Sequence, residues 1–328
     1  MSTRRYFVSK ALQAVLTLVF VLAFNFFLFR GLGDPTTQFL RQAHGALTPQ
    51  AYKDLQHQLG LDLPLVQQFA HYMVQTLQGH LGYSITYNVP VRTVIAQRIW
   101  PTVLLIGTST IATIAVGIWI GIAQGWRRGT KFDVSMLGFT LFTYSMPEFW
   151  FGLLMIMAFS VGVGPFPALF PTGGYESTAV DLTGLSHAID VLNHMALPFI
   201  VLTVSYLGEY SLIMRSSLLE TLGEDFIITA RAKGMREKRV LYQHAVRNAL
   251  LPTMTVTILS LGFIISGAIT IELIFNWPGL GLLTETAAQN LDFPLLEGMF
   301  LLFSASVVIA NLVADLTYSY FDPRVRAG

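Results

Sequence analysis

The chain contains six long apolar runs, and these constrain its fold more than any other feature of the sequence. An α-helix rises about 1.5 Å per residue, so each run is long enough to cross a hydrocarbon core of about 30 Å. Only 12% of the residues are charged, and no soluble domain of ordinary size remains between the runs. The sequence therefore predicts an all-α polytopic membrane protein with six transmembrane helices, at residues 11–29, 102–124, 134–160, 194–214, 253–275 and 297–317.

The first run, Ala11–Phe29, follows a basic start, which is also the pattern of a cleaved signal peptide. The run is longer than the apolar region of a signal peptide, and no cleavage site of small residues follows it. We expect it to be retained as the first transmembrane helix, so that residues 1–30 form a cytoplasmic N-terminus and this helix.

The distribution of Lys and Arg predicts which loops face the cytoplasm. The loops 161–193 and 276–296 contain neither residue, whereas the segments after the second and fourth runs are basic. Further basic residues lie in or beside the long segment between the first two runs, where the rule is weak. We therefore expect both termini on the cytoplasmic side.

Residues 224–252 form the most basic stretch of the chain and lie between two apolar runs. Asp225 can cap a short helix over Phe226–Lys233. Gly234 stands where the chain must leave that helix in a left-handed conformation. Basic side chains in the last turn suit the negative end of the helix dipole.

A second helix is expected from about Glu237, and Pro252 marks where it continues into the next apolar run. Arg239, Gln243 and Arg247 are four residues apart and share one polar face. One interpretation is a basic loop that only sets the membrane topology. A folded pair of helices with its own polar face favours another, a docking element for a soluble partner.

The sequences TARAKG (229–234) and HAVRNALLP (244–252) resemble the cytoplasmic coupling segment of ATP-binding-cassette (ABC) importer permeases, in the dipeptide, oligopeptide and nickel permease family. The wider importer superfamily has Glu-Ala-Ala where this chain has Ile228-Thr229-Ala230, and the peptide branch is similar to this chain in that respect. The resemblance runs from about Gly33-Asp34-Pro35 to Asp322-Pro323-Arg324, nearly the whole chain.

This resemblance implies the type I importer permease fold, with a permease domain at residues 98–317 and a cytoplasmic tail at 318–328. It also implies a second homologous permease subunit, two ABC ATPase subunits, an extracytoplasmic substrate-binding protein and the cytoplasmic membrane of a prokaryote. ATP and Mg²⁺ are expected only in the ATPases, so this chain needs no cofactor of its own. Its contact with the ATPases is expected at Asp225, Thr229, Ala230, Arg231, Ala232, Lys233 and Gly234.

Residues 31–97 are expected to form a small helical extracytoplasmic subdomain. The runs Gly60–Pro64 and Gly79–Ser84 resemble the outer subdomain of the same family, although His80 stands where that family usually has Asp. Apolar residues at helical spacing predict an amphipathic helix that lies on the membrane or packs on the spans, with a stripe of Leu65, Phe69, Met73 and Leu77.

Several classes of site find no support in the sequence. The chain has no cysteine, which excludes thiolate catalysis and Cys-ligated metals. The spacing of His57, His71 and His80 matches no metal-ligand motif, so solvated helix histidines are the favoured interpretation. The run Asn276–Gly281 lacks the third glycine of a phosphate loop and looks like the family's outer turn after the fifth span. No catalytic motif occurs, and a net charge of +1 gives no case for nucleic-acid binding.

Acidic residues inside the predicted spans are candidates for the lining of a translocation path. Glu148 follows Pro147 near the middle of the third run, Glu209 lies in the fourth, and Glu272 lies toward the outer end of the fifth. An ionised side chain at a helix centre costs about 2.5–3.5 kcal/mol on insertion scales, so Glu148 should face protein or water. The alternative is a hydrogen-bonded or protonated glutamate with a structural role.

Gly117, Gly121 and Gly125 repeat every four residues in the second run. This spacing allows two helices to approach closely. We expect packing within the chain, with dimerisation the lesser possibility.

The leading hypothesis is a permease subunit that moves di- or oligopeptides by alternating access, driven by separate ATPases. The lack of Cys and of a His cluster along the spans favours peptides over nickel or another small solute. A secondary transporter working alone would need intramembrane charges, which the glutamates supply, but it leaves the folded basic segment unexplained. A membrane-embedded enzyme would need a nucleophile or metal cluster. Co-purification of an ATPase would separate the importer from the lone transporter.

Overall fold

The structure, a computed structural model, describes residues 3–32, 50, 62–162, 167–177 and 182–321. The regular elements in these ranges are all helices, and one isolated bridge joins Tyr83 and Pro90. Within the same ranges five helices are long and apolar enough to span a membrane: Phe7–Gly31, Val91–Trp126, Leu185–Leu222, Glu237–Ser266 and Phe293–Asp315. A bent helix pair, Lys131–Ser145 with Glu148–Gly162, makes a sixth if it counts as one span. The predicted all-α membrane fold is confirmed.

The chain divides into two compact units. The first comprises Met1–Trp100, Ile265–Ile269 and Gly279–Gly328, and the second comprises Pro101–Ile264 and Thr270–Pro278. The domain boundaries predicted after residues 30, 97 and 317 refer to membrane topology and stay predictions. His57, Gly60, Leu61 and the two ends of the family resemblance lie outside the described residues.

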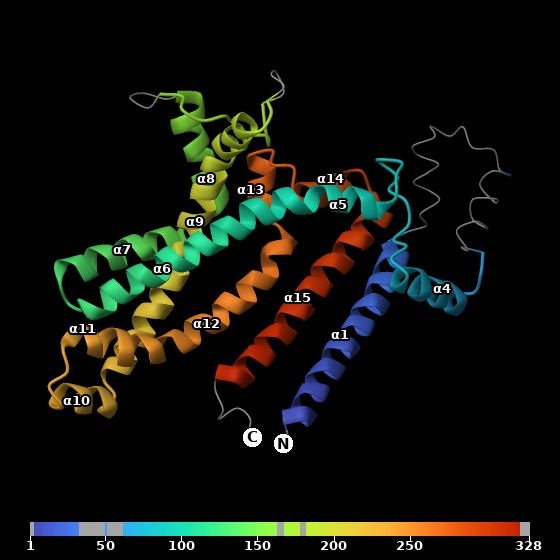
Figure 1. The fold of residues 1–328 in the computed structure, drawn as a ribbon. Helices are drawn as coiled ribbons and strands as arrows, with labels where there is room; N and C mark the ends of the chain where they lie inside the picture. Colours follow the sequence, from blue (N-terminus) through green and yellow to red (C-terminus); the bar gives the residue numbers. More distant parts are fainter. Residues whose placement is uncertain (1–2, 33–49, 51–61, 163–166, 178–181, 322–328) are drawn as a thin grey trace. The chain divides into compact units, whose positions relative to one another are not determined.

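In the first unit, α1 (Thr3–Leu32) and α15 (Phe293–Phe321) run side by side (Figure 1). An ion pair of 3.0 Å joins Lys10 Nζ of α1 to Asp315 Oδ2 of α15. The core of the unit is formed by apolar side chains from α1, the start of α5 (Val91–Thr102), α14 (Leu280–Gln289) and α15. Asp315, within the sixth predicted run, is thus paired with a basic side chain of α1.

The amphipathic helix predicted from the stripe at residues 65–77 is α4 (Leu65–Leu77). Phe69 stacks on Phe27 of α1, with 5.9 Å between the ring centroids, and meets Phe26 edge-on at 5.3 Å. Leu65 and Leu77 at the two ends of the stripe stay exposed. The middle of the stripe therefore packs on α1, and the apolar side chains at its two ends stay exposed.

The start of α15 is held by Asp292, which is fully buried. One carboxylate oxygen of Asp292 accepts a hydrogen bond from the Leu295 amide (3.2 Å), and the other accepts from the Ser84 hydroxyl and the Thr86 amide. Asp292 thus caps the helix and ties it to the loop before α5, because a carboxylate satisfies free amide groups in the first turn.

In the second unit, α6 (Thr108–Trp126) packs closely on α9 (Leu185–Leu222). The α5 helix continues into α6 through a π-helical turn, Val103–Gly107. A Cβ atom at Gly117 would lie 2.7 Å from Tyr210 Cβ, and one at Gly121 would lie 2.6 Å from the Ser211 carbonyl oxygen. The glycines therefore allow the two helices to touch, and the predicted packing within the chain is confirmed.

The third predicted span is not one straight helix. It consists of α7 (Lys131–Ser145) and α8 (Glu148–Ile156), which a π-helical segment extends to Gly162, and the two parts meet at 97°. Pro147 causes the break, because a residue that precedes proline is driven out of the helical region. Met146 accordingly has φ −80° and ψ 125°.

The fifth predicted span, 253–275, is wrong in its limits. The helix α12 (Val246–Phe263) starts earlier and ends in a 3₁₀ turn at Ser266, and a separate helix α13 (Ile269–Ile274) follows. Gly267 between them has φ +74°, a left-handed conformation that ends a helix. Helix α9 also extends beyond its predicted range, 194–214, because a hydrophobic run marks the apolar part of a helix and not its ends.

Candidate functional site

The basic segment between the fourth and fifth spans folds as predicted into two helices, α10 (Asp225–Ala232) and α11 (Glu237–Arg239) (Figure 1). The predicted cap is wrong: Glu224 occupies the N-cap position, and its side chain makes no capping hydrogen bond. Asp225 is instead the first helical residue, where its charge still suits the positive end of the helix dipole. The chain turns into α10 directly from α9, which explains why Glu224, and not Asp225, has the extended conformation.

Gly234 has φ +74°, as predicted for the residue that ends α10. Its amide bonds to the Arg231 carbonyl at 2.9 Å, and the Met235 amide reaches back to the Ala230 carbonyl at 3.4 Å. This pair of hydrogen bonds is the Schellman motif, in which glycine is favoured because it has no Cβ. Lys233 is the C-cap residue, one position beyond the last helical residue.

One face of α10 packs in the hydrophobic core of the second unit. Ile227 is fully buried and Ala230 is nearly so. They pack with residues of α9, of the π-helical segment Val240–Ala245 and of α12: Met214, Leu218, Val240, Leu241, Ala245, Val246 and Ala249. Ala230, predicted to contact an ATPase, therefore faces inward and helps to hold α10 on the segment Val240–Ala245.

On α10 two apolar side chains, one on either side of the buried face, are exposed. Phe226 is 41% exposed and Ile228 is 60% exposed. Among the other residues predicted to contact an ATPase, Asp225, Thr229, Ala232 and Lys233 are exposed as well. The predicted contact residues thus lie on α10 or directly after it, and all of them except Ala230 are exposed.

Arg231 spans the turn between the two helices. Its Nε and Nη2 atoms donate to the two carboxylate oxygens of Glu237 at 3.1 and 3.2 Å, and both side chains are exposed. The next helix carries the predicted polar face, because Arg239 donates to Gln243 at 2.7 Å and Arg247 is exposed on the same helix. The pairing of Arg231 with Glu237 was not predicted from the sequence.

A buried ion pair lies at the base of this segment and was also missed. Arg215 of α9 donates from Nε and Nη2 to the two carboxylate oxygens of Asp133 in α7, at 2.8 and 3.0 Å. Asp133 also accepts from the Gly129 amide at 3.0 Å, while Thr130 caps α7 by accepting from the Asp133 amide. Thr130 followed by an acid three residues later is a capping-box signal that could have located the helix start, but not the partner arginine.

The three candidate path residues are not brought together. Glu148 is the first residue of α8 and accepts a hydrogen bond from the Tyr206 hydroxyl at 3.0 Å. Glu209 lies on α9 less than one turn from Tyr206, so these two glutamates share one region of the unit. Glu272 is fully buried elsewhere and accepts from the Thr102 hydroxyl at 3.2 Å. A role of any of them in a translocation path stays a prediction.

Trp277 fixes the turn that was predicted after the fifth span. Its side chain is fully buried, and its indole Nε1 donates to the Pro101 carbonyl at 2.9 Å. Asn276 before it has φ +46°. In the part of the chain that the structure describes, no group of three or more His, Asp or Glu side chains could hold a metal ion. His71 contacts Gln75, with 3.0 Å between Nε2 atoms.

Comparisons with known proteins agree with this architecture. Residues 113–327 match the family described as binding-protein-dependent transport system inner membrane component, and residues 3–106 match the N-terminal region of that membrane component. The chain is 39% identical over 295 residues to a putative peptide permease protein of Brucella suis, with 90% of each chain covered. It is 38% identical over 311 residues to a dipeptide transport system permease protein of Escherichia coli K12, again with 90% of each covered.

A third relative is an oligopeptide transport system permease protein of Bacillus subtilis, 33% identical over 323 residues, with 98% of this chain and 99% of the relative covered. The predicted ABC importer permease with a type I fold is thereby confirmed. The chain belongs to the family of inner-membrane components of binding-protein-dependent transport systems.

Proposed function

We propose that this chain forms part of the translocation path of an importer that moves di- or oligopeptides into the cytoplasm. Its partners are a second homologous permease, two ABC ATPases and an extracytoplasmic binding protein. The observation that carries the ATPase contact is the exposure of two apolar side chains of α10, Phe226 and Ile228, within a basic segment. Exposed apolar side chains of this kind mark a surface that another protein covers.

The seat of α10 suits a coupling role. Ile227 and Ala230 seat α10 on the segment Val240–Ala245, in a packed core to which α9 also contributes, so a displacement of α10 would be passed through this core to α9. ATP-driven closure of the ATPases would move α10, and α9 would carry the movement into the membrane. The conformations before and after this closure would differ in how the ATPase surface contacts α10. A ligand-driven switch requires such a difference in contact between its two states.

Peptides are the proposed substrate class because the relatives are named as dipeptide, di/tripeptide and oligopeptide permeases. Nickel and other small solutes of the same family remain the alternative. Uptake of a labelled tripeptide by cells that carry the complete system, with Ni²⁺ uptake measured in parallel, distinguishes the two.

The ATPase contact is tested by Ile228→Ser. This side chain contributes apolar surface on α10 and is 60% exposed, so its truncation should leave the permease folded. We expect the amount of ATPase that co-purifies with the chain to fall by about fivefold or more, since truncation of a central interface anchor commonly costs more than about 1 kcal/mol. Peptide-stimulated ATP hydrolysis in reconstituted vesicles should fall in parallel.

The matched control is Ile189→Ser, an isoleucine that is 51% exposed near the other end of α9. It should retain the full amount of bound ATPase. If Ile228→Ser keeps the same ATPase stoichiometry and hydrolysis as Ile189→Ser, α10 is a topogenic loop and the proposed coupling role is wrong.

The proposed topology places the Arg127–Lys131 loop in the cytoplasm and Ser177 and Asn290 outside. The chain has no native cysteine, so single cysteines can be introduced at Arg128, Ser177 or Asn290 without background. An impermeant thiol reagent added to intact cells should label positions 177 and 290, and it should label position 128 only after permeabilisation. Labelling at position 128 but not at position 177 in intact cells would show that the chain has the opposite orientation in the membrane. Gly328, predicted to be cytoplasmic, lies outside the described residues.

A further inference from the structure

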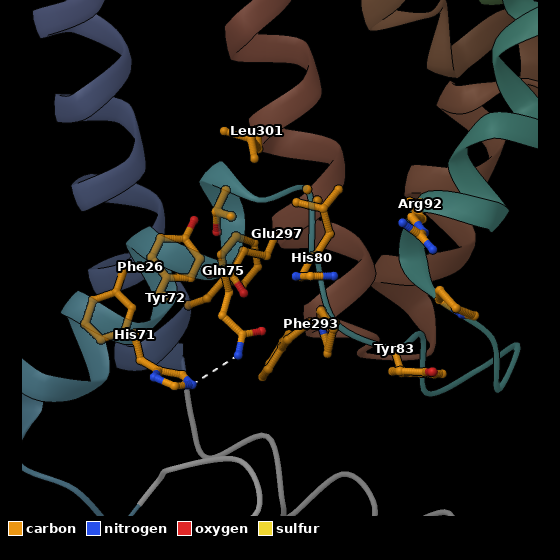
Figure 2. A pocket seen from close by; sticks show the side chains of 18 of the residues that line it. Phe26, His71, Tyr72, Gln75, His80, Tyr83, Arg92, Phe293, Glu297 and Leu301 are labelled. Atoms are coloured by element: carbon orange, nitrogen blue, oxygen red, sulfur yellow. Dashed lines mark hydrogen bonds between the residues drawn. The ribbon is translucent and has the colours of Figure 1, made fainter.

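A cavity of about 640 Å³ lies within the first unit, between the end of α1, helix α4, the loop before α5 and the start of α15. Figure 2 shows its walls, with Phe26 and Tyr72 on one side, Glu297 and Leu301 along α15, and Arg92 on the other side. Neither the proposed ATPase contact nor the candidate path residues use it.

The floor of the cavity is a buried polar network that fixes α4 in place. The Tyr72 hydroxyl bonds to the Glu297 carboxylate and accepts from Asn25 Nδ2 at 3.3 Å. Asn25 Nδ2 also donates to the Glu297 carbonyl at 3.0 Å. Burial and the Glu297 charge raise the pKa of Tyr72, so its hydroxyl keeps the proton that it donates. The carboxylate of Glu297 is therefore engaged by the protein itself.

The remaining charged groups of the cavity are cationic. Arg30 donates a hydrogen bond to Gln68 and attracts the nearby Glu297 carboxylate, and its remaining donor positions can serve a further anion. Arg92 forms no ion pair with any of the described residues and is exposed. His71 and His80 also line the cavity and carry no negative charge. With two arginines against one glutamate, the lining of the cavity carries a net positive charge.

The cavity lies beside the ends of two candidate membrane spans. Arg30 is in the last turn of α1, at the end of the candidate span Phe7–Gly31, and Leu301 lies inside the candidate span Phe293–Asp315. Helix α4 exposes Val66 and Leu77 at 79% and 74%, which suits a helix lying in the membrane interface. The cationic groups thus stand at the level of lipid headgroups, and apolar side chains extend below them.

We propose that this cavity binds an anionic membrane phospholipid, with its phosphate held by Arg30 and Arg92 and the start of its acyl chains against Phe26, Phe29 and Leu301. The planar guanidinium group pairs with phosphate oxygens in a bidentate geometry. The apolar wall takes up the chain carbons next to the headgroup. A bound lipid would join α1, α4, α5 and α15, all of which line the cavity.

The test uses the full chain in phosphatidylcholine nanodiscs that contain a small fraction of phosphatidylglycerol with a photoactivatable acyl chain. After illumination, adducts mapped by peptide mass spectrometry should concentrate in residues 26–30, 71–83 and 293–301. The double variant R30Q/R92Q should lower the adduct yield about tenfold or more, because each basic group near an anionic lipid contributes about 1 kcal/mol. The double variant R30K/R92K keeps the charge and should retain most of the yield.

The control R98Q removes an arginine from the same helix as Arg92 at a position that does not line the cavity, and it should match the wild type. Thermal unfolding midpoints of all variants verify that they are folded. Unlabelled phosphatidylglycerol should displace the probe, whereas inorganic phosphate and a tripeptide should not. Displacement of the probe by phosphate would indicate a site for free anions, and displacement by the tripeptide would indicate a peptide site. An adduct yield in R30Q/R92Q equal to that of the wild type would show that the two arginines do not hold the lipid phosphate. Each of these three results overturns the proposal.

Discussion

Gly121→Leu is expected to abolish the folded protein. A Cβ atom at position 121 would lie 2.6 Å from the Ser211 carbonyl oxygen and 2.7 Å from Met214 Cβ. The carbonyl belongs to the backbone of α9 and cannot rotate away, so α6 and α9 must separate. Overpacking in a core costs about 1–3 kcal/mol where side chains can adjust, and the cost should be at least that here.

Separation of α6 and α9 would also break the hydrogen bond of 3.1 Å from the Ser211 hydroxyl to Gln124, both of which are fully buried. We therefore expect no monodisperse peak for Gly121→Leu in fluorescence-detected size-exclusion chromatography. Gly121→Ala should give a weaker peak with a lower thermal midpoint.

The matched control is Gly138→Leu in α7, where nothing lies within 4 Å of the added Cβ. This variant should elute like the wild type, since Leu is also a better helix former than Gly. If Gly121→Leu and Gly138→Leu behave alike, the close approach of α6 to α9 is not what holds the second unit together.

Asp133→Ala is expected to destabilise the second unit by about 3 kcal/mol or more, the usual cost of breaking a buried ion pair by removing one partner. The Asp133 side chain is 4% exposed and Arg215 is 20% exposed, so water replaces the lost carboxylate poorly. The Gly129 amide loses its acceptor as well. For a protein of this size the thermal midpoint should fall by about 6 °C or more.

The double variant Asp133→Ala/Arg215→Met separates two causes of the destabilisation: the loss of the Asp133 carboxylate and the uncompensated charge that is left on Arg215. It removes the uncompensated charge together with the carboxylate and should recover part of the lost stability. Arg231→Gln is the control, because the Arg231–Glu237 pair is 45% and 57% exposed and such pairs contribute about 0–1 kcal/mol. An equal fall in the thermal midpoint for Asp133→Ala and Arg231→Gln would show that the buried pair contributes no more to stability than the exposed pair.

Several features of this protein were determined by local sequence alone. The apolar runs indicate transmembrane helices because burial in lipid needs a continuous apolar stretch, and each of the six overlaps a candidate span or the bent pair. Gly234 ends α10 because glycine can adopt a left-handed backbone, and Pro147 breaks the third span because proline restricts the backbone of the residue before it. The four-residue glycine repeat predicted close packing because its spacing puts the glycines on one helix face.

The family could be predicted from TARAKG and HAVRNALLP because each motif is a contiguous stretch of the sequence. Where a prediction concerned the exact end of a helix, the sequence was insufficient. Asp225 was taken as the cap of α10, yet the end of α9 places Glu224 there. The limits of the fifth span were wrong because the helix ends at Gly267, inside an apolar run that hydropathy reads as continuous.

Only the tertiary structure decided which distant residues meet. Asp133 and Arg215 are 82 positions apart, and Ser84 and Asp292 are 208 apart, with no local pattern that links either pair. The same holds for the cavity, whose walls come from four helices. Hydropathy records how apolar each segment is, but not which face of a helix meets another. The burial of Ala230 and the exposure of Ile228, two residues apart, depend on that choice of face.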